Sequence, residues 1–143
     1  MKSRDAVTSS AEVTVERLGP DDWAAVRPLV RRHDPRIPEE RWRLLFHHPW
    51  PGDDPHRGWA LVHAGEVVGY CGIVPSTRMI AGRRERLCNL TTWVVDDDFR
   101  SHSLRVITPA LRLRDQTLVD LSPNADAARW NARWGFTPFE TTL

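Results

Sequence analysis

Cysteine, lysine and tyrosine are scarce in this chain of 143 residues, and neither sign of charge dominates. The two cysteines, Cys71 and Cys88, are too few and too far apart for a disulfide framework or a zinc knuckle, so we expect a reducing, cytoplasmic setting. No apolar run approaches the roughly 20 residues of a membrane span, and the N-terminus lacks the apolar segment of a signal peptide. A formal net charge of +1 leaves no global field that would steer the chain to nucleic acid or to a membrane.

The remaining composition is that of a globular protein. A hydrophobic fraction of 41% in 143 residues is enough for one domain with its own core. Residues 1–11 are polar and small, which predicts a flexible N-terminal tail, and residues 12–143 are expected to form a single domain. Lys2 is the only lysine, so the basic charge is almost all arginine, which suits forked contacts to phosphate.

The first third of the chain predicts a strand and two helices. Alternating apolar residues indicate a strand over Glu12–Leu18. Apolar residues at helical spacing indicate a helix from Trp23 to about His33, which the prolines of residues 34–38 end. A second helix is expected over Glu39–His47.

The next ten residues, 48–57, are rich in proline, histidine and aspartate. They lack a fixed metal-ligand spacing, so we expect no metal. The prolines and the glycine favour a surface loop.

Two Ala-Gly pairs predict tight turns between antiparallel strands. The turn at Ala64-Gly65 would pair His63 with Glu66, Leu61 with Val68 and Trp59 with Tyr70. The turn at Ala81-Gly82 would set Arg78 against Glu85 and Tyr70 against Trp93. We therefore expect Trp59, Tyr70 and Trp93 to lie in one row on one face of the sheet.

The stretch from Asn89 to Leu113 predicts a strand, a turn and a helix. The strand is apolar and β-branched through Val95, and three aspartates, Asp96 to Asp98, follow it. Ser101 and Ser103 are both plausible N-caps of the helix, whose core stripe is Leu104, Ile107 and Leu111. Pro109 implies a kink or a late helix start. The free amides of a helix start favour an anion there.

The last part of the chain predicts a strand, a helix and a strand. Residues 116–121 form a short apolar strand, and Ser122 to Asp126 would cap a helix over Ala127–Trp134. Gly135 would end that helix. A final strand is expected over Phe136–Thr142.

The strand and loop around Val95 resemble motif A of the GNAT acyltransferase superfamily. Val95 lies five positions before Arg100, as in the family loop that begins with Arg or Gln. The resemblance implies that backbone amides of Arg100 to Arg105 hold the pyrophosphate of an acyl-coenzyme A. Ser103 and Arg105 occupy the positions of the two family glycines, where Ser103 can supply a hydroxyl and Arg105 a charge.

A second resemblance runs from Asn124 through Ala127 and Trp130 to Gly135-Phe136. The family element has the pattern Asn-x-x-Ala-x-x-apolar-Tyr-x-x-apolar-Gly-Phe, and its tyrosine often protonates the departing thiolate of coenzyme A. Asn131 stands at that tyrosine position. An amide cannot donate a proton as a phenol can, so the general-acid role is vacant.

Together the two motifs imply a GNAT-like α/β fold. Its mixed, mostly antiparallel central sheet would carry helices on both faces, in the order β-α-α-β-β-β-α-β-α-β. The family normally adds one more strand after the one that begins near Phe136. Three explanations are open for the missing strand: a partner supplies the edge, the domain is naturally trimmed, or a longer form of the protein exists. If a second copy of this chain is the partner, the protein would form a homodimer through its C-terminal edge strand.

The resemblance also implies an activity and a set of site residues. The expected function is N-acyl transfer, in the first instance of acetyl, from acyl-coenzyme A to a small-molecule or peptide amine. The alternative is a catalytically weak or inactive acyl-coenzyme A binding domain. The candidate catalytic residues are Glu85, with Glu66 as a second choice of base, and Asn131. The candidate cofactor-binding residues are Trp93, Val94, Val95, Arg100, Ser101, His102, Ser103, Leu104, Arg105 and Asn124.

Overall fold

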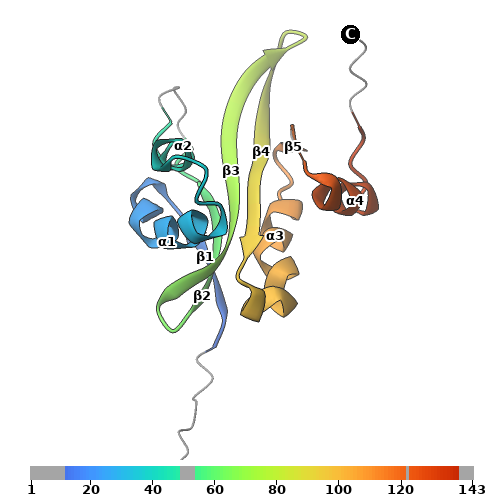
Figure 1. Ribbon diagram of the computed structural model, residues 1–143. Coiled ribbons are helices and arrows are strands. Elements are labelled where there is room, and N and C mark those ends of the chain that lie inside the picture. Colours follow the sequence, from blue (N-terminus) through green and yellow to red (C-terminus); the bar gives the residue numbers. More distant parts are fainter. Residues whose placement is uncertain (1–11, 49–53, 122, 139–143) are drawn as a thin grey trace, which may run out of the picture.

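A computed structural model of the protein describes residues 12–48, 54–121 and 123–138. Its centre is a five-stranded sheet in the order β1-β2-β3-β4-β5, in which only the β4–β5 pair is parallel (Figure 1). The elements are β1 (Thr14–Leu18), η1 (Pro20–Asp22), α1 (Trp23–His33), α2 (Glu39–Arg43), β2 (Gly58–His63), β3 (Glu66–Ile80), β4 (Arg83–Val95), η2 (Asp97–His102), α3 (Ser103–Leu111), β5 (Thr117–Val119) and α4 (Ala125–Arg133), where η marks a 3₁₀ helix.

Helices cover both faces of this sheet, and each face has its own apolar core. Figure 1 shows α1 and α2 on one side and α3 and α4 on the other. The first core joins α1 and α2 to the sheet through Val26, Leu29, Val30, Trp42, Phe46, Ala60, Tyr70 and Val94. The second joins α3 to the sheet through Trp59, Leu61, Cys71, Ile73, Cys88, Leu90, Val106, Ile107 and Ala110. The predicted mixed, mostly antiparallel sheet with helices on both faces is confirmed.

The predicted boundaries are accurate for α1 and less so for its neighbours. α1 spans Trp23–His33, as predicted. The first strand begins at Thr14 rather than Glu12, and α2 ends at Arg43 instead of reaching His47. Turn hydrogen bonds carry the chain on from α2, and they leave Phe46 almost fully buried against the first core.

Both Ala-Gly turns form as predicted. Ala64 and Gly65 have φ angles of 49° and 78°, and Ala81 and Gly82 have φ angles of 51° and 76°. Two successive positive φ angles match the right-handed twist of the flanking strands. The predicted pairs His63–Glu66 and Arg78–Glu85 are both present.

The predicted aromatic row is wrong, because each hairpin contains a register shift. Val68 has no partner between the pairs Val62–Val67 and Leu61–Gly69, and the pairing of β3 with β4 likewise skips Thr91. One extra residue sends the following side chains to the other face. Trp59 and Trp93 therefore flank Cys71 on the α3 face, whereas Tyr70 lies between Ala60 and Val94 in the core under α1.

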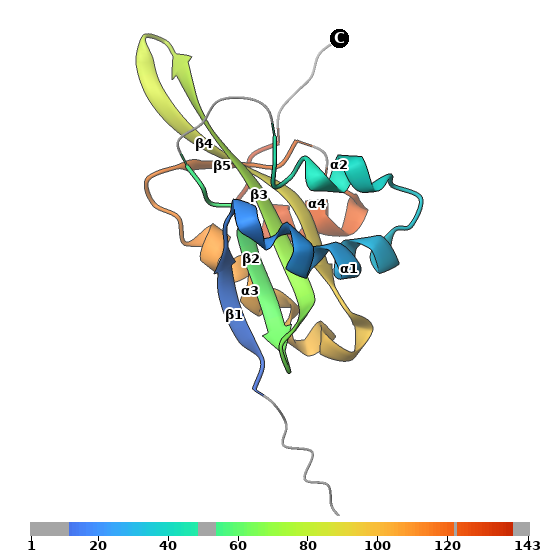
Figure 2. The same cartoon turned by 90° about the vertical axis from the view of Figure 1, so that its left-hand side faces the viewer.

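Strands β3 and β4 are longer than predicted, and their joined ends project beyond the helices as a two-stranded ribbon (Figure 2). In contrast, β5 is only Thr117–Val119 and pairs with Leu87–Asn89 of β4. The final strand expected over Phe136–Thr142 does not form in residues 136–138, and the rest of it lies outside the described residues, as do the predicted tail of residues 1–11 and Ser122.

The start of α3 differs from the prediction. The 3₁₀ helix η2 leads directly into α3, whose N-cap is His102, and neither Ser101 nor Ser103 caps it through its side chain. Pro109 lies within α3 without ending it before Leu111. α4 begins two residues earlier than predicted, is capped by Asn124, and is followed by Gly135 with a φ angle of 86°.

Candidate functional site

A cleft lies where β4 continues past β5. β5 pairs only with Leu87–Asn89, so no strand within the described residues borders that edge of β4 from Leu90 to Val95. A cleft of about 520 Å³ occupies this space between β4 and α4. Its lining is His33, Cys71, Leu90, Thr91, Thr92, Trp93, Val94, Val95, Arg100, Ser103, Ile107, Asp120, Pro123, Asn124, Asp126, Ala127, Trp130 and Asn131.

The lining of the cleft comes from both faces of the sheet. His33 ends α1, which packs on one face, whereas Ser103 and Ile107 belong to α3 on the other. The cleft at the exposed edge of β4 is therefore bordered by residues from both faces of the sheet.

The end of β4 directs a backbone donor into this gap. The amide of Asp96 donates to the carbonyl of Val68 on β3 at 2.8 Å. Successive amides of a strand point to opposite edges, so the amide of Val95 points away from β3, toward the cleft. A fixed amide of this kind can stabilise a carbonyl oxygen that gains negative charge.

The bulge residue Thr91 adds a second polar group. Its hydroxyl oxygen is buried and has no hydrogen-bond partner among the described residues, and the residue lines the cleft. Gly72 makes room for it, since a Cβ atom there would lie 2.6 Å from the Thr91 hydroxyl and 2.5 Å from that of Tyr70. A buried hydroxyl without a partner beside a cleft is suited to a polar ligand atom.

Regular strand alternation would place Asn89, Thr91 and Trp93 on one face of β4, but the structure does not. The bulge at Thr91 interrupts the alternation between them, so Thr91 lies beside Gly72 and Tyr70 while Trp93 packs on the α3 side. The Asn89 amide, oriented to donate, reaches the carbonyl of Val119 on β5 at 3.2 Å. Asn89 thus joins the two strands at the end of their pairing.

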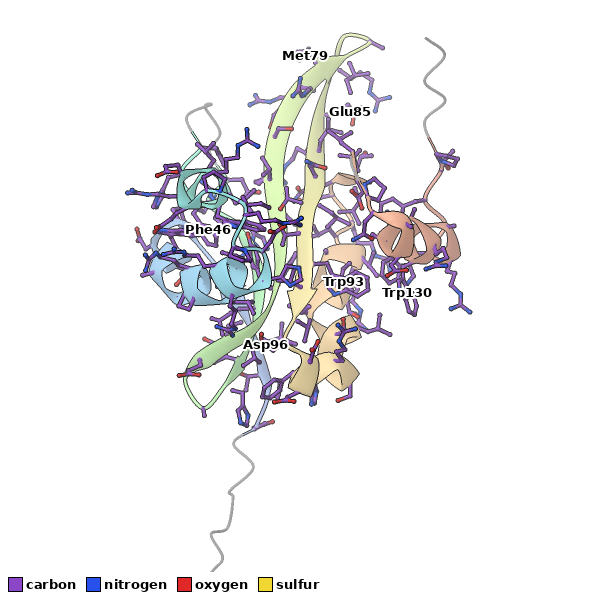
Figure 3. All side chains as sticks on the ribbon, viewed as in Figure 1. Phe46, Met79, Glu85, Trp93, Asp96 and Trp130 are labelled. Carbon is purple, nitrogen blue, oxygen red and sulfur yellow. The ribbon has the colours of Figure 1, made fainter. Side chains whose placement is uncertain are left out.

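An aromatic cluster closes the α4 side of the cleft. Trp93 lies 5.7 Å from Trp134 and 6.3 Å from Trp130, measured between ring centroids, and Trp130 stacks on Trp134 at 5.5 Å. Figure 3 shows the side chains of Trp93 and Trp130 directed toward each other. The indole nitrogen of Trp93 also donates to the carbonyl of Ser103 at 3.1 Å, so one side chain ties β4 to both α3 and α4.

The segment that resembles a phosphate loop is a 3₁₀ helix instead of an open amide cradle. The amide of Phe99 donates to the carbonyl of Asp96, and the amide of Ser103 donates to that of Arg100. In a 3₁₀ helix residues three apart share a face. This explains why Arg100 and Ser103 line the cleft together. The guanidinium of Arg100 lies 2.9 Å from the carboxylate of Asp97.

The other predicted loop residues do not line the cleft. Ser101 and Leu104 are exposed, and Arg105 turns back to the carbonyl of Val13 at 2.9 Å. His102 contacts that same arginine, with its Nδ1 atom 3.2 Å from the guanidinium. Of the side chains of this loop, only those of Arg100 and Ser103 therefore line the cleft, because the helical winding directs the others elsewhere.

A carboxylate that the sequence analysis missed lies across the cleft from β4. Asp120 directly follows β5, and its Oδ2 atom accepts a hydrogen bond of 2.9 Å from the side-chain amide of Asn131 on α4. Asn131 is buried, Asp120 is half-buried, and both line the cleft. An acidic residue placed immediately after a strand and before a polar turn is the signal that could have identified it.

Solved structures of other proteins share this architecture. An acetyltransferase of Trypanosoma brucei matches with a TM-score of 0.63 at 14% identity, over 92% of this chain and 97% of that one. An aminoglycoside N-acetyltransferase in complex with CoA matches with a TM-score of 0.66 at 16% identity, over 96% and 95% of the two chains. A ribosomal-protein-alanine N-acetyltransferase of Brucella melitensis biovar Abortus 2308 matches with a TM-score of 0.62 at 15% identity, over 92% of this chain and 96% of that one.

The chain has the GNAT fold. No protein-family model matches the sequence, and no curated protein does. Two structures of an aminoglycoside N-acetyltransferase share only 16% and 13% of their sequence with this chain. The likeness therefore lies in the backbone architecture and not in shared side chains. The roles of individual residues in this GNAT fold therefore depend on its own geometry.

Within the GNAT fold, Glu85 does not reach the cleft. It lies on the projecting ribbon, well away from Trp93 and Trp130 (Figure 3). Its carboxylate is 3.9 Å from the guanidinium of Arg83. β4 is 13 residues long, so its beginning and its cleft-lining end are far apart. Glu66, the second candidate base, is exposed beside the first hairpin turn.

The described part of the GNAT fold holds no group of three or more histidine, cysteine, aspartate or glutamate side chains arranged to bind a metal ion. Its described helices include none that is both long and apolar enough to cross a membrane.

The remaining predicted residues, Trp93, Val94, Val95, Asn124 and Asn131, all line the cleft. Asn124 uses its side-chain oxygen to cap α4, accepting from the amide of Ala127 at 2.8 Å.

Proposed function

We propose that the protein transfers an acyl group from an acyl-coenzyme A thioester to the nitrogen of an amine. The observation that carries the proposal is the cleft along the edge of β4 beyond the end of β5, lined from both faces of the sheet, with the amide of Val95 directed into it. The GNAT fold supports the same reaction class, since the matching structures are named as acetyltransferases and one contains CoA. Acetyl is the proposed acyl group.

The residues of the cleft fit the thioester end of an acyl-coenzyme A. The exposed edge of β4 offers backbone groups to an extended ligand, and the buried hydroxyl of Thr91 offers a polar atom that lacks a partner among the described residues. Arg100 and Ser103 supply a cation and a hydroxyl at the α3 end, where the phosphates would lie. The amides of η2 are partly engaged in its own hydrogen bonds, so these side chains would carry more of the phosphate binding.

The chemistry requires three contributions from the protein. A base must accept a proton from the amine, a donor must stabilise the thioester oxygen, and the thiolate must gain a proton. The amide of Val95 is the proposed oxygen donor. Asn131 cannot protonate the thiolate, so that proton must come from the attacking amine or from water, and turnover is expected to be slow.

A second candidate function is binding of acyl-coenzyme A without efficient turnover. Two observations favour it: Asn131 stands at the position of the family acid, and its amide is already bonded to Asp120. A free-thiol release assay with acetyl-coenzyme A separates the two functions. The amines to test first are aminoglycosides and alanine peptides, because two of the matching structures are named as an aminoglycoside and a ribosomal-protein-alanine N-acetyltransferase. Thiol release that depends on an added amine supports transfer. Binding in calorimetry without release supports the second function.

Replacing Arg100 by alanine is expected to weaken acetyl-coenzyme A binding about tenfold to a hundredfold. The reason is that a charge-assisted hydrogen bond to phosphate contributes roughly 1.5–3 kcal/mol. The melting temperature of the ligand-free protein should hardly change, because Arg100 is exposed and its pair with Asp97 is on the surface. Titration calorimetry of the wild type and the variant measures the difference.

The matched control is Arg36→Ala, which removes another exposed arginine paired with a nearby aspartate, outside the cleft. Its affinity for acetyl-coenzyme A should equal that of the wild type. Equal affinities in Arg100→Ala and Arg36→Ala would remove Arg100 from the site. Ser103→Gly is not expected to tighten binding, because Ser103 has ordinary helical φ and ψ angles that require no glycine.

A further inference from the structure

We infer that Asp120 is the subsite for the acceptor amine, and that Asn131 positions it. The inference rests on the proposed acyl transfer and names its substrate class: a primary amine that is a cation at neutral pH. Asp120 would bind the ammonium group through charge and then accept its proton. Asn131 would thus orient the base, Asp120, although the family pattern has its acid, a tyrosine, at this position.

The first argument is that Asp120 forms no ion pair within the described residues. There its side chain accepts a hydrogen bond from the neutral amide of Asn131. The other acidic side chain lining the cleft, Asp126, is paired with Arg129. A half-buried carboxylate without a counter-ion beside a cleft attracts a cationic ligand, since pairing offsets the cost of its partial burial.

The second argument is that Asn131 is held rigidly. It is only 8% exposed, and its carbonyl accepts from the amides of Trp134 at 3.1 Å and Phe136 at 2.9 Å. Its side-chain amide therefore contacts Oδ2 of Asp120 from a fixed place on α4. A neutral donor orients the carboxylate without cancelling its charge, and leaves Oδ1 for the ligand.

The surrounding titratable groups leave the charge of Asp120 available. They are His33 from α1, Cys71 from β3, Arg100 from η2 and Asp126 from α4, all of which line the same cleft. Arg100 is paired with Asp97. Burial, and to a smaller degree the neighbouring Cys88 and Asp120, raises the pKa of the Cys71 thiol far above neutrality, so that Cys71 stays uncharged.

The proton transfer then has a defined course. The amine enters as an ammonium ion and gives one proton to Oδ1 of Asp120, which frees its lone pair. Nitrogen forms a bond to the thioester carbon, and the carbon–sulfur bond breaks. The thiolate takes the second proton of the nitrogen, directly or through water, which yields the amide and the free thiol. Asp120 returns its proton to solvent.

Two variants test the roles of the pair. Asp120→Asn preserves the shape of the side chain and removes its charge, so kcat/KM for a cationic amine should fall by ~10²–10⁴. The acid limb of the pH profile should also disappear. Asn131→Ala removes a hydrogen bond to the charged carboxylate, so the acid limb should move to higher pH while acetyl-coenzyme A affinity is kept. The control is Asp115→Asn, which removes an exposed carboxylate that pairs with Arg86 outside this cleft.

A second measurement does not depend on turnover. The side-chain amide signal of Asn131 is followed by NMR while 1,4-diaminobutane is added to the full chain. The signal should shift in the wild type and stay unmoved in Asp120→Asn. An unmoved signal in the wild type, or a wild-type rate and pH profile in Asp120→Asn, overturns the inference. Failure of acetyl-coenzyme A to bind in calorimetry overturns the proposed function instead, and the diamine titration still decides on Asp120.

Discussion

Gly58→Ala is expected to destabilise the protein by about 3 kcal/mol or more, which lowers the melting temperature by about 10 °C or prevents folding. Gly58 has a φ angle of 117°, a region that side chains rarely enter. A Cβ atom there would lie 2.0 Å from the carbonyl oxygen of Cys71. This obstacle is backbone in the middle of the sheet, between β2 and β3, so it cannot rotate away as a side chain can.

Gly65→Ala is the matched control. Gly65 also has a positive φ angle, of 78°, but a Cβ atom there would meet nothing within 4 Å. This variant should lose only about 1 kcal/mol, from backbone strain alone. Thermal unfolding followed by circular dichroism compares the two variants with the wild type. Similar melting temperatures for both variants would contradict the close approach of β2 to β3 at Gly58.

Acidification from pH 6.5 to 4 is expected to remove up to about 3 kcal/mol of stability through His56. Burial, and secondarily the positive charge of Arg17, lowers the pKa of His56 from 6.5 to about 4. Its Nδ1 atom accepts from the amide of Gly58 at 3.1 Å, and its ring contacts Trp59 edge-on at 4.4 Å between centroids. Both contacts suit the neutral imidazole.

The sign of this pH dependence follows from the direction of the shift. Above pH 6.5 the histidine is neutral in the folded and unfolded states, and its contribution to stability is fully present. Between pH 6.5 and 4 only the unfolded chain takes up the proton, so the free energy of unfolding falls with pH. Urea unfolding at several pH values measures it.

The His56→Asn variant isolates this effect. Asparagine keeps a hydrogen-bond acceptor for the amide of Gly58 but does not ionise in this range. The variant should be less stable than the wild type at pH 7 and should lose less stability on going to pH 4.5. If both proteins lose the same free energy between these pH values, a group other than His56 causes the acid destabilisation.

Local features of the sequence were sufficient for much of the fold. The apolar spacing of Trp23–His33, the two Ala-Gly turns and the glycine after α4 each act within a few residues, and the structure contains them as predicted. The order of elements through α4 follows from such local patterns, because each strand or helix is specified by its own periodicity. The resemblance to the GNAT superfamily indicated the fold, and several predicted residues, among them Val95 and Arg100, line the cleft.

Pairing between distant segments decided the remainder. The bulges at Val68 and Thr91 moved Tyr70 away from Trp59 and Trp93, because the face of a side chain depends on how many residues separate it from a turn. The early end of β5 opened the cleft, and the length of β4 left Glu85 on the ribbon. The packing of α4 brought Asn131 to Asp120. Hydrogen bonds between strands and helices far apart in the chain determine these positions, and single-residue preferences do not encode them.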